Sequence, residues 1–443
     1  MLESPFRLEA MSEQKLHPIR GLVGTARLPG DKSISHRLAI LGALAEGTTE
    51  LANYSSGDDC RRTLECLRHL GVEVEVSESE DQGLRVRVQG RGLGGLRAPA
   101  VELDAGNSGS TLRMLAGVLA AQRFEAVLTG DGSLQRRPMG RVAEPLRQMG
   151  ATINGREGDF PPLRIQGAAL RAIDYTLPVA SAQVKTAILL AGLHAEGTTA
   201  VEEPTRTRDH TEIALAELGA TVERRRRRVT LAGRPRLQGK AFAIPNDFSA
   251  AAFLLVAGLL LKQTNLLLPQ VGLNPTRTAL LDFLVPQGAA IKILEVQEAN
   301  GELRGNLHVR GGGRLQGGTI EGALTAKLID ELPVLAVLGT QTEEGLRIRD
   351  AAELRLKESD RIGALAENLR RLGASVQEYP DGLEVAGRQK LHGAVVDSFG
   401  DHRIAMALAV AGLVAEGETT LRGAECVEIS FPGFFEVLEA LRE

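Results

Sequence analysis

Residues Leu28 to Arg37 place a turn signal directly before two cations, two hydroxyls and a histidine. They read Leu-Pro-Gly-Asp-Lys-Ser-Ile-Ser-His-Arg, and an apolar run begins at Leu38. Pro-Gly marks a turn and helical spacing follows it, so we predict a helix start here. The free N–H groups and positive dipole end of such a start favour phosphate or carboxylate. The spacing matches neither the P-loop nor the dinucleotide fingerprint, so it points to neither ATP nor NAD. A capped helix with a solvated basic first turn is the alternative.

Other polar clusters in the first half of the chain stand ahead of predicted helices. Residues 104–113 and 181–185 are small and polar, so a ligand could approach their backbone closely. A plain turn with a capping side chain is the alternative. Residues 131–141 set three arginines around a proline, and Arg137, just before Pro138, is the one best suited to hold a carboxylate with two hydrogen bonds. Solvated surface is the alternative there.

Charged clusters in the second half break a local rule. Asp330 and Glu331 precede a wholly apolar helix, where a cap needs only one of them. Helix starts favour acids, yet Lys357, Arg361 and Arg403 lie near predicted starts. The repeated exception indicates an anionic ligand that these cations share.

The composition excludes several classes of protein. A chain of 443 residues predicts two or more domains. A formal net charge of -4, 3% aromatic residues and no Trp argue against a nucleic-acid binder. The cysteines Cys60, Cys66 and Cys426 are too few and too awkwardly spaced for a disulfide framework or a zinc site, so we expect reduced thiols, a cytoplasmic protein and no metal.

No segment predicts insertion into a membrane. The longest apolar stretch, residues 248–261, is shorter than a span needs. The first residues carry Glu3 and Glu9 without an apolar core, so we expect no signal peptide, and Met11 is a possible alternative start.

A weak sixfold repeat is the main structural signal. Each copy has an apolar helical run, followed by a short polar turn and a strand-like run. The six apolar runs are residues 39–45, 114–121, 187–195, 253–261, 334–340 and 407–415.

A second helix in five of the copies ends at a glycine before a β-rich run. Gly71, Gly150, Gly219, Gly288 and Gly373 stand where a helix end needs positive φ. The sixth copy ends the chain as a helix, Phe434 to Leu441. These units predict an α/β protein of six modules, arranged as two compact domains of three units, with a solenoid as the alternative.

The strand predicted at Gly21 to Leu28 has no helix of its own before it. It could pair with the last modules and make one domain discontinuous. The predicted domains are then residues 1–30 plus 246–443 and residues 31–245, with crossovers at Pro29-Gly30 and near Pro245. The opening stretch would lie at the mouth of the cleft between them, a usual place for a ligand.

Five motifs together resemble the 5-enolpyruvylshikimate-3-phosphate (EPSP) synthase family. They are Asp31-Lys32-Ser33-Ile34-Ser35-His36-Arg37, Gly106-Asn107-Ser108-Gly109, Arg137-Pro138-Met139-Gly140-Arg141, Arg355-Leu356-Lys357-Glu358-Ser359-Asp360-Arg361 and Asp401-His402-Arg403. They occur in the family's order and cover almost the whole chain after the first twenty residues. The resemblance implies a two-domain inside-out α/β barrel, each domain built of three βαβαββ units.

The resemblance also implies the reaction. Phosphoenolpyruvate and shikimate 3-phosphate would give 5-enolpyruvylshikimate 3-phosphate and phosphate, without a cofactor, by addition and elimination. C3 of the enol is protonated, the shikimate 5-hydroxyl attacks C2, and phosphate leaves. A monomer in aromatic amino-acid biosynthesis is expected, with neither nucleic acid nor membrane as a partner.

Residue roles follow from the resemblance by position. Lys32, Asp330 and Glu358 would be catalytic: Asp330 as base at the 5-hydroxyl, and Glu358 or Lys32 as the proton donor to C3. A donating Glu358 needs a raised pKa. Shikimate 3-phosphate would bind Lys32, Ser33, Arg37, Ser181, Ala182 (by its backbone), Gln183, Asp330 and Lys357. Phosphoenolpyruvate would bind Lys32, Gly109, Arg137, Arg361 and Arg403. Asp31 and His36 are expected to cap or support.

This chain departs from the family pattern in one motif. Many members carry a Lys just before the C-terminal Thr-Phe-Pro, and Ile429 stands there, so one phosphoenolpyruvate contact is missing or replaced. The first motif, together with residues 208–212, looks more like the divergent second class, several members of which tolerate glyphosate and have Ala where this chain has Gly109. We therefore expect Gly109 to leave room for glyphosate.

Two rival functions are weaker. The related transferase that acts on UDP-N-acetylglucosamine lacks the Lys-Ser-Ile-Ser-His-Arg sequence and commonly uses a cysteine on a mobile loop, where none of the three cysteines is expected. An anion-binding repeat protein without catalysis would have no need of Asp330 and Glu358.

Overall fold

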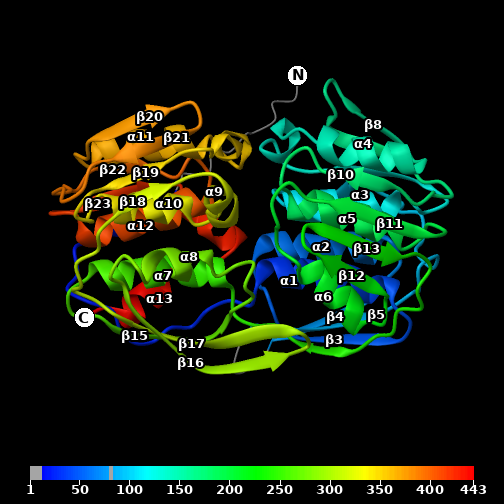
Figure 1. Cartoon of the computed structure of the whole chain (residues 1–443), viewed down its shortest axis with the longest axis horizontal. Coiled ribbons are helices and arrows are strands. Elements are labelled where there is room, and N and C mark those ends of the chain that lie inside the picture. The colour runs from blue at the N-terminus through cyan, green and yellow to red at the C-terminus, as the bar shows by residue number, and fades with distance from the viewer. Residues whose placement is uncertain (1–11, 79–82) are drawn as a thin grey trace, which may run out of the picture.

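The computed structural model describes residues 12–78 and 83–443, and these form two halves that lie side by side (Figure 1). The expectations about a signal peptide and Met11 concern residues 1–11 and lie outside the described residues. Each half has its own core of buried apolar side chains. One core takes its residues from 16–28 and 248–441, the other from 34–244.

One unit of the repeat is continuous in the chain and gives the pattern of the rest. Its sheet has the order β10-β11-β13-β12, with β10 parallel to β11 and the other pairs antiparallel. The unit is therefore βαβαββ. Its elements are β10 (Asp174–Thr176), α5 (Ala182–Gly192), β11 (Thr198–Glu202), α6 (His210–Glu217), β12 (Val222–Arg225) and β13 (Arg228–Ala232).

The other two units of this half follow the same plan, but the first borrows its opening strand. That strand is β14 (Ala241–Ala243), which follows the third unit in the chain and pairs parallel with β3 of the first. The first unit continues with α1 (Lys32–Leu44), β3 (Thr48–Tyr54), α2 (Asp58–His69), β4 (Glu73–Glu78) and β5 (Leu84–Gln89). The second has β6 (Leu103–Asp104), α3 (Gly109–Leu119), β7 (Glu125–Thr129), η1 (Leu134–Arg136), α4 (Gly140–Met149), β8 (Thr152–Arg156) and β9 (Phe160–Gln166).

Three more units form the other half. The fourth has β2 (Val23–Thr25), α7 (Phe248–Leu260), β15 (Asn265–Gly272), α8 (Ala279–Leu284), β16 (Ala290–Ala299) and β17 (Glu302–Arg310). The fifth has β18 (Gly318–Ile320), α9 (Ala323–Leu328), α10 (Leu332–Gly339), β19 (Leu346–Ile348), η2 (Ala352–Leu356), α11 (Arg361–Arg371), β20 (Val376–Tyr379) and β21 (Gly382–Val385). The sixth has β22 (Val395–Asp397), α12 (His402–Val414), β23 (Thr419–Arg422), η3 (Ala424–Ile429), α13 (Phe434–Leu441) and β1 (Glu13–Leu16).

The N-terminal segment has a shorter strand than predicted. The strand expected at residues 21–28 is only β2, but it pairs with the C-terminal modules as expected: β2 lies parallel to β15 of the fourth unit, and Leu22 bridges to Arg442 of the sixth. A separate strand, β1, pairs antiparallel with β23 of the last unit. The physical reason is that α13 ends the sixth unit without a strand pair, which leaves the backbone groups on one side of β23 free for β1.

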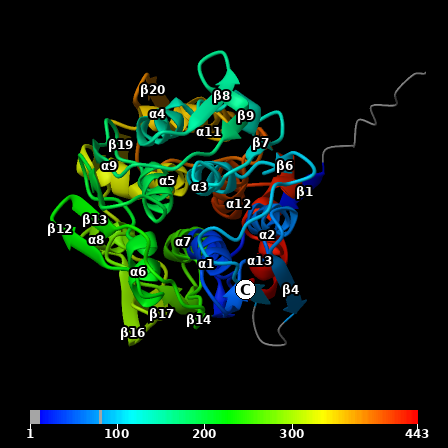
Figure 2. The ribbon, with the colours of Figure 1, turned by 90° about the vertical axis from the view of Figure 1, so that its right-hand side faces the viewer.

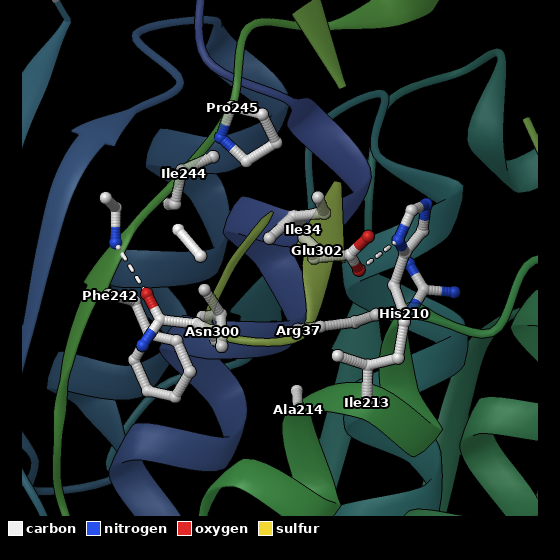
Figure 3. A pocket seen from close by; sticks show the side chains of 13 residues that line it. Ile34, Arg37, His210, Ile213, Ala214, Phe242, Ile244, Pro245, Asn300 and Glu302 are labelled. Carbon is white, nitrogen blue, oxygen red and sulfur yellow. Dashed lines mark hydrogen bonds and ion pairs between the residues drawn. The ribbon is translucent and has the colours of Figure 1, made fainter. Parts of the chain in front are cut away.

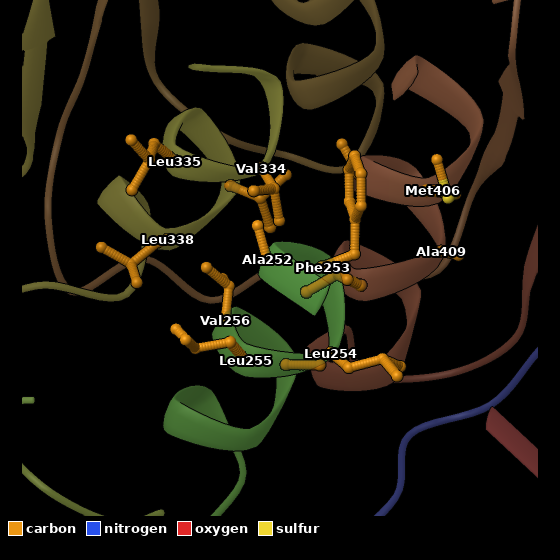
Figure 4. Close-up of a cluster of buried hydrophobic side chains, with 14 of the residues drawn as sticks. Ala252, Phe253, Leu254, Leu255, Val256, Val334, Leu335, Leu338, Met406 and Ala409 are labelled. Atoms are coloured by element: carbon orange, nitrogen blue, oxygen red, sulfur yellow. The ribbon is translucent and has the colours of Figure 1, made fainter. Parts of the chain in front are cut away.

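The six apolar runs lie in helices that are buried on nearly all sides, as expected for helices apolar all round. Figure 4 shows Phe253 of α7 packed between α10 and α12, with Val334 and Met406 nearby. Figure 2 looks onto the half that contains residues 34–244. In this half α1, α3 and α5 are grouped inside, and the sheets that contain β4, β8 and β12 lie around them. No helix within the described ranges is long and apolar enough to cross a membrane.

Local signals for the repeat are confirmed. The five helix-ending glycines have φ between 82° and 120°, a region that favours glycine. The final helix has the predicted bounds. Two compact cores exclude the open solenoid.

The two connections between the halves lie side by side. Asp31 N–H donates to the Pro245 carbonyl at 2.8 Å, and Asp247 N–H donates to the Pro29 carbonyl at 2.9 Å. The chain passes between the cores at these segments, but the domain limits given above stay a prediction.

Candidate active site

The start of α1 is held by both connections. Asp31 caps the helix, accepting the Ile34 N–H at 2.8 Å, and Asp247 accepts the Lys32 N–H at 3.0 Å. Gly30 is required just before them, because a Cβ there would lie 1.8 Å from the Asn53 carbonyl oxygen. The predicted helix start is confirmed, and Asp31 has its expected capping role.

Lys32 points its ammonium at a carboxylate that sequence reasoning missed. Its Nζ lies 3.0 Å from Asp59 Oδ2 in the first turn of α2. Burial alone would lower the pKa of Lys32, but Asp59 outweighs burial and raises it, so the side chain stays a cation. An acid in a first helix turn is the ordinary complement of the dipole, which is why Asp59 gave no signal.

Arg37 is buried and held by neutral oxygens. It donates to the Thr211 hydroxyl at 2.7 Å, the Ser33 carbonyl at 2.9 Å and the Thr186 hydroxyl at 3.2 Å. Burial, followed by the like charge of Arg208, lowers its pKa to about 10. A solvated first turn is therefore wrong for Arg37, which is a desolvated cation at neutral pH.

Arg137 is likewise buried, which excludes the solvated-surface alternative. Its guanidinium donates to Asn107 Oδ1 at 2.6 Å and to Ser133 Oγ at 3.1 Å. Gly109, the first residue of α3, lies beside it. A Cβ on Gly109 would stand 2.5 Å from Arg113 Nη1 and 3.4 Å from Arg137 Nη1. The close approach of these two guanidiniums explains why glycine fits there.

The start of α5 adjoins the start of α3. Ser181 caps α5 by accepting the Val184 N–H at 3.3 Å, and Ala182 is the first helical residue. Gln183 accepts from Arg113 Nη1 at 2.9 Å and donates to Ser110 Oγ at 2.8 Å. Gln183 thus joins the Gly109 side of the site, and Arg113 is a second residue that sequence reasoning missed.

Asp330 lies among the site cations of the opposite half. Arg403 Nη1 donates to its carbonyl at 2.8 Å, and Arg361 Nη1 lies 3.9 Å from its Oδ1. Burial opposes ionisation, but the surrounding cations, Arg403 and Arg208 foremost, hold the pKa of Asp330 well below its usual range. Asp330 is therefore a carboxylate at neutral pH.

Glu358 lies between two arginines. Arg361 Nη2 donates to its Oε2 at 2.5 Å, and Arg137 Nη1 donates to its Oε1 at 3.3 Å. Burial opposes ionisation, but Arg361 and then Arg137 hold the pKa of Glu358 well below its usual range. Glu358 therefore does not have the raised pKa that a proton donor needs, because two guanidiniums stabilise its charged form.

Lys357 is partly buried beside the same carboxylates. Burial lowers its pKa, while the charge of Asp330 opposes the change. Lys357 therefore loses its proton more easily than an ordinary lysine does.

Direct contacts join the two halves at these residues. Arg208, on the loop after β11, forms an ion pair with Asp330 and donates to Ser33 Oγ at 3.2 Å. Ser133 Oγ donates to the Glu358 carbonyl at 3.1 Å, next to the Arg137–Glu358 pair. The sequence-predicted residues of the two halves therefore face one another.

Arg208 and Arg277 are two further site cations. Arg208 stands in the residues 208–212 noted above, and Arg277, 4% exposed, lies 3.9 Å from Asp330 Oδ2. Arg277 stands in a loop with no local signal, so only the fold reveals it.

Ile429 lines an open pocket with Asp58, Arg62 and Asn107, and none of Arg137, Arg361 and Arg403 lines that pocket. Arg62 supplies a cation to the pocket of Ile429, but it is paired with Asp58 and Asp104.

The site thus gathers helix starts and cations at the contact between the two halves. The starts are those of α1, α3, α5, α10, α11 and α12, each supplying at least one of the residues above. Helix starts and cations both attract anions. The arrangement is that of a two-part α/β enzyme for small anions, with cations and carboxylates of both halves brought together.

Comparisons with known proteins give the same class and a family. The model of the EPSP synthase (3-phosphoshikimate 1-carboxyvinyltransferase) family matches residues 16–438. A 3-phosphoshikimate 1-carboxyvinyltransferase of Solibacter usitatus is 56% identical over 97% of this chain and 100% of its own length, and one of Koribacter versatilis is 51% identical over 98% and 100%. An EPSP synthase structure from Acinetobacter baumannii is 40% identical over 97% of this chain and 98% of its own, with a TM-score of 0.85.

The chain belongs to the EPSP synthase family. The predicted fold class, the two-domain inside-out α/β barrel of six units, is confirmed by this structural match. The rival that uses a loop cysteine is not favoured. Cys60, Cys66 and Cys426 are all buried, and burial raises the pKa of each thiol.

Proposed function

We propose that this protein transfers the enolpyruvyl group of phosphoenolpyruvate to the 5-hydroxyl of shikimate 3-phosphate and releases phosphate. The observation that carries the proposal is the pairing of each catalytic carboxylate with an arginine from the opposite half, Asp330 with Arg208 and Glu358 with Arg137. Two substrates that are both anions would take the place of such carboxylates on the arginines.

Shikimate 3-phosphate would bind at the starts of α1 and α5. Lys32, Ser33 and Arg37 supply two cations and a hydroxyl from α1, and Arg208 reaches the same Ser33 hydroxyl. Ser181, Gln183 and the Ala182 backbone would hold it from α5, with Asp330 and Lys357 on the opposite side.

Phosphoenolpyruvate would bind near Glu358. Arg137, Arg361 and Arg403 would hold its carboxylate and phosphate, Gly109 would line its pocket and Lys32 would contact it. With its negative charges on Arg137 and Arg361, these arginines would stabilise ionised Glu358 less, and the pKa of Glu358 would rise toward that of a proton donor. Lys32, which remains protonated beside Asp59, is the second candidate donor.

Asp330 would accept the proton of the 5-hydroxyl. Its low pKa makes it a weak base in the free enzyme, and shikimate 3-phosphate bound to Arg208 would remove one of the charges that cause this. We also propose a cytoplasmic monomer with domains 1–30 plus 246–443 and 31–245. The buried free thiols fit a reducing compartment, and one chain supplies both sides of the cleft.

The test is phosphate release from phosphoenolpyruvate in the presence of shikimate 3-phosphate. We expect turnover by the wild type and a loss of about 10²- to 10⁴-fold in kcat for Asp330→Ala, the range for a positioned acid or base. Val395→Ala, an exposed substitution on β22, is the control. No turnover of shikimate 3-phosphate by the wild type would refute the assignment.

A further inference from the structure

A buried cluster of three charges lies behind the site. Lys185 of α5 is 1% exposed, and its ammonium lies 3.0 Å from Glu203 Oε2 and 2.7 Å from Glu212 Oε1. The two carboxylate side chains are 2% and 1% exposed. Buried ion pairs lose much of their attraction to desolvation, and apolar side chains of similar size often stabilise a fold as well. The cluster is therefore poorly explained by stability alone.

One arm of the cluster leads to Arg208. Glu203 Oε1 accepts the backbone N–H of Thr207 at 3.2 Å and also its hydroxyl. This closes the loop 203–207 on itself just before Arg208, whose guanidinium pairs with Asp330. Because Lys185 fixes the other oxygen of Glu203, it fixes the base of the loop that carries Arg208.

The other arm leads to Arg37. Lys185 and Thr186 are adjacent, as are Glu212 and Thr211, and the two threonine hydroxyls both accept from Arg37. Arg37 therefore links α5 to α6 through the two threonines, and Lys185 links the same two helices through Glu212, at the neighbouring position of each helix. The carboxylate of Glu212 also acts on Arg37, opposing the lowering of its pKa by burial and by Arg208.

Residues of the opposite half hold the far end of the same loop. Asn274 Nδ2 donates to Asp209 Oδ1 at 2.9 Å, and His210 Nδ1 lies 2.6 Å from Glu302 Oε1. Figure 3 shows His210 and Glu302 facing each other, with Arg37 and Ile34 from α1 beside them. Arg208 is thus placed between one anchor within its own half and another across the cleft.

We propose that Lys185 is a positioning residue, which through Glu203 and Glu212 sets Arg208 and Arg37 in the geometry that receives the phosphate of shikimate 3-phosphate. Lys185 is buried, and its ammonium pairs with Glu203 and Glu212 rather than with Asp330. The role in substrate binding rests on the proposed function, whereas the ordering of the loop does not.

The first experiment measures amide hydrogen exchange of residues 203–209 in the ligand-free protein. Lys185→Met is expected to raise exchange there by about tenfold or more, since a charge-assisted anchor of the loop is lost. Leu190→Ala, a buried apolar truncation on the same helix, is the control for general destabilisation. Unchanged exchange in Lys185→Met, or an equal rise in Leu190→Ala, would overturn the proposal whether or not the protein is a transferase.

The second experiment separates the two substrates. Lys185→Met is expected to raise KM for shikimate 3-phosphate by about tenfold and KM for phosphoenolpyruvate much less, and Lys185→Arg should restore most of the difference. A neutral triple variant, Lys185→Met with Glu203→Gln and Glu212→Gln, removes the unpaired carboxylates. If it folds as stably as wild type and regains wild-type KM, the charges only pack and the proposal fails. If KM stays raised, the proposal stands. A wild type without turnover but with the expected exchange would refute the proposed function alone.

Discussion

Arg37 in one half of the site and Arg361 in the other are both buried, but their partners differ in charge. Arg37 donates to two hydroxyls and a carbonyl, whereas Arg361 lies on Asp401 at 2.7 Å and on Glu358. Their pKa values accordingly shift in opposite directions. Burial lowers that of Arg37 to about 10, and Asp401 outweighs burial to raise that of Arg361.

The difference indicates a division of tasks between the halves. A cation held by neutral oxygens keeps its charge available for an incoming dianion. Arg137 is intermediate, because it donates to Asn107 and Ser133 but also to the Glu358 carboxylate of the other half. A cation held by carboxylates is fixed in direction but partly neutralised. We infer that the α1 half supplies net attraction, while the Asp330 half supplies orientation and proton transfer.

The largest predicted effect is on stability, and it is tested by one arginine substitution in each half. Arg361→Gln leaves Asp401 buried without its ion-pair partner, so we expect it to lower the free energy of unfolding by about 3–5 kcal/mol. Arg37→Gln loses only bonds to neutral acceptors, and we expect about 1–2 kcal/mol. Urea denaturation of both variants measures the difference.

The affinity for shikimate 3-phosphate should be affected in the opposite order by the same two variants. Arg37→Gln is expected to weaken shikimate 3-phosphate more than Arg361→Gln does, as judged by calorimetric titration of variants that remain folded. Equal losses of stability in the two variants would contradict the division of tasks.

The next largest expected effect is on glyphosate binding, and it tests how easily Arg113, which is held by the neutral amide oxygen of Gln183, moves. In Gly109→Ala the new Cβ would meet Arg113 Nη1 and press toward Arg137, both of which end in flexible chains. We expect glyphosate to compete with phosphoenolpyruvate in the wild type. The variant should bind glyphosate about tenfold or more weakly, a change of about 1.4 kcal/mol.

Steady-state inhibition at several phosphoenolpyruvate concentrations checks both statements. The control is Gly132→Ala, in a turn of the same half where the nearest atom to a new Cβ is 3.6 Å away. Unchanged glyphosate inhibition in Gly109→Ala would show that the space at this helix start does not decide inhibitor binding.

The repeat, and the positions of many candidate site residues, could be predicted from the sequence because their signals are local. Apolar runs and helix-ending glycines are written in short windows. Lys357, Arg361 and Arg403 were visible because cations at helix starts oppose the dipole. Asp59 obeyed the same rule and so gave no signal.

What the sequence could not give depends on distant partners. Strand β1 has four residues and pairs with β23 some four hundred residues away, and no local pattern encodes such a pairing. The low pKa of Glu358 likewise depends on Arg137 from the other half as well as on nearby Arg361. Sequence spacing reveals only the second of these partners.

The smallest effect sharpens the comparison through pH. The pKa of Glu358 is depressed in the folded protein, so its ionised form stabilises the fold above the pKa of an unfolded Glu, about 4.3. That contribution is lost as pH falls through the folded value. Glu358→Gln should therefore lose less stability than wild type between about pH 5 and pH 3, by at most about 1.4 kcal/mol per pH unit for one proton.

Urea denaturation at several pH values gives the two slopes, and Glu344→Gln is the control because it changes a glutamate away from the arginines of the cleft. Above pH 6 the wild type and Glu358→Gln should have parallel profiles, because the carboxylate is ionised in both the folded and the unfolded chain. Parallel profiles also below pH 5 would mean that Arg361 and Arg137 do not hold Glu358 ionised. The Asp330 half would then lack the ion pairing that distinguishes it from the half that holds Arg37 on neutral oxygens.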